Sequence, residues 1–113
     1  MPFQYGYTSE KFHQAVLALA SSSESIQERL GSACSYYLSR LKSEDIPNEF
    51  KDDFKQIQEL QITERPNGSM IAVNLSDEEA DRIAEKIVLI YDDLAQRLGV
   101  YDAQYESRQK PDH

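Results

Sequence analysis

This 113-residue sequence is short of the residues that hold small secreted or metal-binding proteins together: it has one Cys and no Trp. The single cysteine, Cys34, cannot form an intramolecular disulfide, and no second Cys or paired His completes a metal-ligand spacing. No apolar run approaches the roughly 20 residues that span a bilayer. The N-terminus also lacks the basic and apolar regions of a secretory signal. We therefore expect a cytoplasmic protein with no disulfide, no metal and no contact with a membrane.

Basic residues are also few, with 12 Lys and Arg against 20 Asp and Glu, which gives a net charge of −8. This sign opposes direct binding to nucleic acid, where Lys and Arg must replace the counterions of the phosphates. The charge is uneven: residues 43–64 contain seven acids and two lysines, whereas residues 1–42 contain three acids and four bases. A basic partner would therefore meet the middle and later helices first.

The length suits one compact core, and 40% of the residues are hydrophobic. We expect residues 1–101 to form a single helical domain and residues 102–113, which lack an apolar stripe, to form a flexible C-terminal tail. The protein is expected to be a monomer or a small homo-oligomer.

The first half of the chain predicts two helices. The first covers about residues 9–20, with Thr8 as its N-cap and apolar positions at helical spacing from Phe12 onward. The second starts at a capping box, either at Ser21 or at Ser25, and runs to about Leu41. Gly31 weakens that helix by about 1 kcal/mol relative to Ala, which predicts a close crossing with another helix.

The second half predicts two more helices. Pro47 suits the first turn of a third helix that presents Phe50, Phe54 and Ile57 to the core. Residues 76–79, Ser-Asp-Glu-Glu, form the capping box of a last helix that runs to about Leu98, with Gly99 after its end. Its wide apolar arc predicts a central position. The core is expected to include the following side chains: Phe12, Leu30, Phe54, Ile87 and Leu94.

Between the third and last helices, residues 64–68 read Glu-Arg-Pro-Asn-Gly and predict a loop. The segment 70–75 is either a short helix capped by Ser69 or a strand that pairs back on residues 61–63. Because a lone hairpin is marginal in water, we expect the short helix. The predicted fold class is all-α, a compact bundle of four main helices, with a short fifth helix or a small hairpin near residues 61–75.

Four segments of the sequence carry a resemblance. They are Tyr-x4-Phe-x2-Ala-Val at 7–16, Ile-Gln-Glu-Arg-Leu at 26–30, Glu-Asp-Ile-Pro-x-Glu-Phe at 44–50 and Leu-Ser-Asp-Glu-Glu-Ala at 75–80. In these positions the chain resembles a group of small uncharacterised bacterial proteins with no established activity. The resemblance implies a bacterial cytoplasmic origin and a shared helical fold, and it brings no catalytic residue with it.

The candidates for chemistry are few. His13 would need an oriented partner to act as a general base, and the sequence identifies none. Cys34 falls within the apolar face of the second helix, where a thiol acts as a small hydrophobe. The acids of residues 77–81 lack the glycine turn of a cation-binding loop and fit the electrostatics of a helix start. With no nucleotide-binding glycine pattern and no nucleophile elbow, no cofactor and no catalytic residue are expected.

One edge of the second helix stands out against the acidic background. Arg29, Tyr36 and Arg40 are spaced i, i+7 and i+11, which places them within an arc of about 40° on a continuous helix. Two guanidinium groups beside a phenol could bind a carboxylate or phosphate of a partner. The alternative is that the arginines pair internally with acids of the third or last helix.

The sequence therefore predicts a non-catalytic protein-interaction or regulatory module with this edge as its candidate contact. Two other readings remain open. The first is a small enzyme or enzyme subunit without a recognisable motif, which would need titratable groups converging on a buried polar pocket. The second is an acidic inhibitor that mimics nucleic acid and captures a nucleic-acid-binding protein. That reading requires acids of two or three helices to form one continuous surface.

Overall fold

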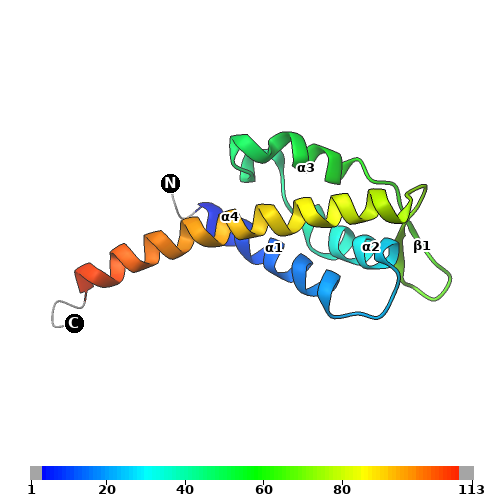
Figure 1. Cartoon of the computed structure of the whole chain (residues 1–113), viewed down its shortest axis with the longest axis horizontal. Coiled ribbons are helices and arrows are strands. Elements are labelled where there is room, and N and C mark those ends of the chain that lie inside the picture. The colour runs from blue at the N-terminus through cyan, green and yellow to red at the C-terminus, as the bar shows by residue number, and fades with distance from the viewer. Residues whose placement is uncertain (1–3, 110–113) are drawn as a thin grey trace.

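The computed structural model describes the backbone of residues 4–109 and the side chains of residues 5–98. This part of the chain forms four α-helices, three short 3-10 helices and one two-stranded sheet (Figure 1). The α-helices are α1 (Gln4–Ala20), α2 (Ile26–Tyr36), α3 (Lys51–Gln58) and α4 (Asp77–Gln109), and the strands are β1 (Ile62–Glu64) and β2 (Met70–Ala72). The 3-10 helices that lead from α2 to α3 are Leu38–Arg40, Ser43–Asp45 and Asn48–Phe50. The prediction of a mainly helical fold is confirmed, with a small sheet added to it.

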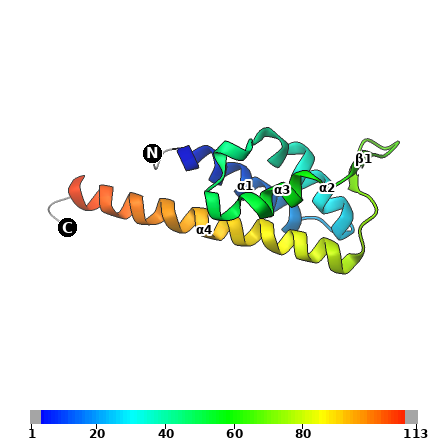
Figure 2. The ribbon, with the colours of Figure 1, turned by 90° about the horizontal axis from the view of Figure 1, so that it is seen from above.

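The long helix α4 packs against α1, α2 and α3, as its wide apolar arc predicts, but it runs along one side of them and not through their centre (Figure 2). It begins at the predicted capping box: the backbone N–H of Ser76 donates to Glu79 Oε1 at 2.9 Å, and the backbone N–H of Glu79 donates to Ser76 Oγ at 3.1 Å. The bond from the Ser76 backbone is the main reason why the pKa of Glu79 is lowered. The helix α1 runs antiparallel to α4 (Figure 1).

The predicted core is confirmed. The five side chains expected there are all buried, and the rings of Phe12 and Phe54 lie 6.3 Å apart between centroids. These two phenylalanines join α1 to α3. Leu30 brings α2 to the same core, and Ile87 and Leu94 bring α4 to it.

The expected short helix at residues 70–75 is wrong, because this segment forms an antiparallel hairpin in which Thr63 pairs with Ile71. The physical reason is that the hairpin is not alone. A Cβ atom placed on Gly31 of α2 would lie 2.6 Å from the backbone nitrogen of Ile71, so strand and helix touch at that glycine. Ala72 is only 2% exposed. The close crossing predicted at Gly31 exists, although its partner is a strand and not a helix.

Two helix boundaries near the N-terminus also differ from the predictions. The helix α1 begins at Gln4, so Thr8 is not its N-cap; its buried hydroxyl instead donates to the carbonyl oxygen of Asp45 at 3.0 Å. The helix α2 starts at the capping box of Ser25, as one of the two alternatives had it, but it ends at Tyr36 and not near Leu41. The chain then turns through a 3-10 helix, which buries Leu41 and the nearby Leu38.

At the other end, α4 continues through Gly99 to Gln109, so the helix end predicted at Gly99 is wrong. A glycine inside a helix costs about 1 kcal/mol relative to Ala but does not forbid the helical conformation. The expected flexible tail at residues 102–113 therefore overlaps helix as far as residue 109. Residues 110–113, and the side chains beyond residue 98, lie outside the described part of the chain.

Candidate interaction site

The predicted edge of Arg29, Tyr36 and Arg40 does not form a continuous row, because α2 ends at Tyr36. The guanidinium of Arg29 is held inside the fold: Nη1 donates to the carbonyl oxygen of Leu19 at 2.8 Å and Nε donates to that of Glu24 at 3.0 Å. Arg29 thereby ties the start of α2 to the C-terminal end of α1.

Arg40 makes a weaker contact, since its Nε donates to the carbonyl oxygen of Tyr36 at 3.3 Å. The ring of Tyr36 is 47% exposed. Among the ion pairs of residues 5–98, none involves Arg29 or Arg40. Arg29 is therefore bonded within the fold, as the alternative of internal pairing predicts. Its partners, however, are backbone carbonyls and not acids of the third or last helix.

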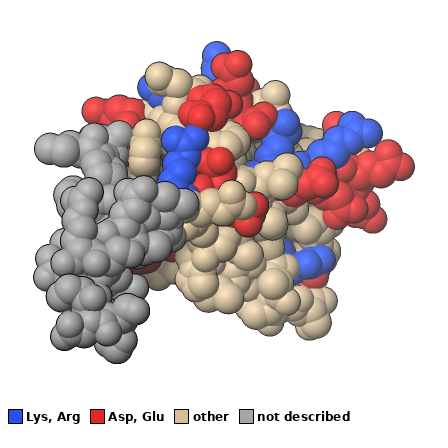
Figure 3. All heavy atoms as spheres, turned by 60° about the vertical axis from the view of Figure 1, so that its left-hand side comes forward, with Lys and Arg blue, Asp and Glu red and all other residues tan. Residues whose placement is uncertain are grey.

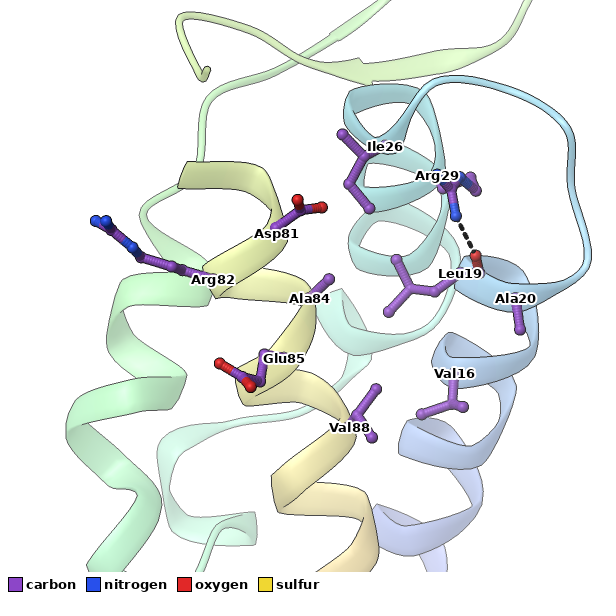
Figure 4. Close-up of a pocket in the computed structure, with 10 residues that line it drawn as sticks. All are labelled: Val16, Leu19, Ala20, Ile26, Arg29, Asp81, Arg82, Ala84, Glu85 and Val88. Atoms are coloured by element: carbon purple, nitrogen blue, oxygen red, sulfur yellow. Dashed lines mark hydrogen bonds between the residues drawn. The ribbon is translucent and has the colours of Figure 1, made fainter. Parts of the chain in front are cut away.

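A groove lies between α1, the start of α2 and the first half of α4, and Figure 4 shows the side chains that line it. Its volume is about 490 Å³. The apolar part comes from three helices, with Val16, Leu19, Ala20, Ile26, Ala84 and Val88 as its lining. The charged part of the lining is Asp81, Arg82 and Glu85 of α4 together with Arg29 of α2.

The α1 side of this groove carries no charged side chain. Residues 12–23 contain no Asp, Glu, Lys or Arg. On the exposed side of α1, Leu17 is 50% exposed, and Val88 of α4 is 43% exposed. Since α1 lies below α4 in Figure 1, it contributes to the broad uncharged surface in the lower part of Figure 3. Contiguous exposed apolar patches on soluble proteins mark interaction sites more often than isolated apolar residues do.

Acids and bases alternate on the opposite side of α4, where α3 packs. Lys86 Nζ lies 2.8 Å from Asp53 Oδ1, and Arg97 pairs with both Glu49 and Asp93. Hydrogen bonds with Asp93 first, and then with Glu49, raise the pKa of Arg97. Positive and negative side chains are correspondingly mixed in the upper part of Figure 3. Lys86 and Arg97 therefore lie among the acids where α3 packs on α4.

The structure supplies a partner for His13 that the sequence could not identify. Its Nδ1 lies 3.1 Å from the hydroxyl oxygen of Tyr91, and the two rings are 5.5 Å apart between centroids. The imidazole is exposed. In the described part of the chain no third titratable side chain hydrogen bonds to this pair, so nothing orients it toward a reacting group.

Cys34 lies where the sequence predicted, within the core. It lines a smaller cavity of about 280 Å³ together with Leu38, Phe54, Ile57 and Ile62. Burial raises the pKa of its thiol to about 12. The thiol is therefore protonated at neutral pH and acts as an apolar group, since the thiolate is the nucleophilic form.

Comparisons with known proteins add no identification: the chain matches no family model, no curated protein and no solved structure. Among residues 5–98, no three His, Cys, Asp or Glu side chains gather as metal ligands would. In the same part of the chain, no helix combines the length and apolarity needed to cross a membrane. The sequence predicts Val16 and Ala20 as part of the apolar stripe of the first helix, and it does not single out Val88. The absence of charge from residues 12–23 is the feature that could have pointed to a binding surface at Val16 and Ala20.

Proposed function

We propose that this chain is a non-catalytic protein-interaction module of a bacterial cytoplasm and that it binds a helical segment of its partner in the groove between α1 and α4. The observation that carries this proposal is the apolar groove beside an uncharged helix face, on a chain in which 28% of the residues are charged. Exposed apolar area costs solubility and contributes nothing to the core. A role in binding a partner accounts for these exposed apolar side chains.

The other two functions find less support. A small enzyme needs titratable groups that converge in a cavity, whereas His13 is exposed and no third titratable side chain of residues 5–98 hydrogen bonds to His13 or Tyr91. An acidic inhibitor needs uninterrupted acids, whereas Lys86 and Arg97 neutralise those between α3 and α4. Tyr36 with Arg40 stays a second candidate contact, because the phenol is exposed and Tyr and Arg are common at the centres of interfaces.

The test compares two substitutions at neighbouring positions of α4. Val88→Asp places a charge in the groove, and Leu89→Asp places the same charge on a residue that is 56% exposed and does not line the groove. Affinity capture from bacterial lysate should retain a protein on the wild type and on Leu89→Asp that is missing from Val88→Asp. That protein is then purified, and its Kd for each variant is measured by calorimetry.

We expect Val88→Asp to weaken binding at least about tenfold, because a charge at the centre of an apolar contact loses its water without gaining a partner, and Leu89→Asp to leave the Kd nearly unchanged. Circular dichroism should show the same helix content in all three proteins. Equal affinity of the two variants for the purified partner would contradict the proposal, as would the absence of any protein that distinguishes them.

A further inference from the structure

Building on the proposed function, we infer that the occupant of the groove is an amphipathic helix with Lys or Arg along the flank that faces α4.

The apolar floor has the spacing of a helix-packing surface. Val16 and Ala20 are separated by one turn on α1, and Ala84 and Val88 are separated by one turn on α4. Because α1 and α4 are antiparallel, the two valines lie side by side at one end of the groove (Figure 4). A third helix fits such a pair of rows by inserting apolar side chains at i, i+3, i+4 and i+7. The small alanines leave room for its close approach.

The rim of the groove differs in charge between its two sides. Asp81 and Glu85 lie one turn apart on the α4 side, both exposed, and neither takes part in the ion pairs found among residues 5–98. Figure 4 shows Asp81 above the groove, whereas Arg82 and the carboxylate of Glu85 point away from it. On the α2 side, the guanidinium of Arg29 is already bound to two carbonyl oxygens. A cationic side chain on the occupant would therefore meet the carboxylate of Asp81, which has no ion-pair partner among residues 5–98.

A second copy of the chain fits less well. It would bring a net charge of −8 toward another −8, and residues 12–23, its own uncharged face, contain no Lys or Arg to meet Asp81.

The experiment uses two synthetic helices of roughly 18 residues, which is five turns, each labelled with fluorescein. Both carry the same Leu stripe, and they differ only in having Lys or Glu along one flank. Their binding to the full-length protein is measured by fluorescence anisotropy at low and at high salt. The protein variants are Val88→Asp, the isosteric pair Asp81→Asn with Glu85→Gln, and a control pair, Asp52→Asn on α3 with Glu59→Gln directly after it, which changes the net charge equally. This control is called the α3 control pair.

We expect the Lys peptide to bind at least about tenfold more tightly than the Glu peptide at low salt, with the difference shrinking at high salt. The rim pair should lose about twofold to fivefold in affinity for the Lys peptide, as expected for the loss of one exposed ion pair. The α3 control pair should match the wild type. Val88→Asp should abolish binding of both peptides, which locates the contact in the groove.

Three results would overturn the inference: equal binding of the two peptides, the same loss in the α3 control pair as in the rim pair, or binding by neither peptide. These outcomes are separable from a failure of the proposed function. A purified partner that is sensitive to Val88→Asp and indifferent to Asp81→Asn with Glu85→Gln would leave the interaction module standing and remove only the basic helix.

Discussion

Substituting Gly31 by alanine tests the contact that decides the fold of the second half of the chain. Gly31 is buried on α2, and a Cβ atom there would lie 2.6 Å from the backbone nitrogen of Ile71 and 2.6 Å from the carbonyl carbon of Met70. Both neighbours are backbone atoms of β2, which cannot rotate away as the end of a side chain can. The substitution must therefore displace the strand.

The size of the effect follows from this geometry. An ordinary contact begins near 3.4 Å, so β2 must move outward from 2.6 Å by about 0.8 Å. Overpacking of this kind costs about 1–3 kcal/mol, and a backbone obstacle places it at the upper end. The better helix propensity of alanine offsets about 1 kcal/mol of this loss of stability. We expect Gly31→Ala to lower the free energy of unfolding by about 2 kcal/mol.

The assay is urea unfolding followed by circular dichroism, with Gly6→Ala as the matched control. Gly6 lies on α1, and a Cβ atom there would meet nothing within 4 Å, so this substitution should stabilise the protein by up to about 1 kcal/mol. If Gly31→Ala were as stable as Gly6→Ala, the hairpin would not lie against α2, and the account of why the sheet forms would fail.

Four further predictions concern stability and reactivity. Leu94→Ala should cost about 2–5 kcal/mol in urea unfolding through lost burial and a residual cavity. Arg29→Ala should cost about 1.5–3 kcal/mol through the loss of two charged hydrogen bonds, whereas Arg40→Ala should stay within about 0.5 kcal/mol of the wild type. Cys34 should not react with a thiol reagent in the folded protein at neutral pH and should react fully in urea, because burial raises the pKa of its thiol to about 12. Because Glu79 has a pKa below its usual 4.5 in the folded chain, its stabilising contribution is present above that pH and is lost as the pH falls through the lowered value. The unfolding curves of the wild type and Glu79→Gln should therefore converge in acid.

The sequence predicts an element well where local chemistry decides it. The capping boxes at Ser25 and Ser76 set the starts of α2 and α4, because each satisfies backbone N–H groups within four residues. The hairpin was mispredicted because its stability comes from α2, more than 30 residues earlier in the chain, which touches β2 at Gly31. A hairpin alone in water is marginal, but the contact with α2 stabilises this one.

The predicted end of the second helix near Leu41 is wrong for a related reason. No Gly, Pro or Asn occurs in residues 37–46 to mark the end of the helix at Tyr36, so the spacing from Arg29 to Arg40 predicts a continuous edge. The helix ends because the turn that follows brings Leu38 and Leu41 into the core, where both are buried. The bonds of Arg29 to two carbonyls depend on how α1 meets α2, which the spacing of residues along one helix cannot reveal.

The face of α1 shows how far composition alone can lead toward a binding site. The core requires only one side of this helix, so the opposite side is available for charged residues, as on α3, where Lys51, Asp52 and Lys55 lie outside the core. Residues 12–20 of α1, and the three serines that follow the helix, have no such charge. Helix stability gives no reason for that difference, because Lys, Glu and Arg are good helix formers. A contact surface does give a reason, since charged residues are depleted at the centres of interfaces. The missing charges are visible in the sequence, but the groove beside them forms only where the antiparallel α4 brings Ala84 and Val88 next to α1.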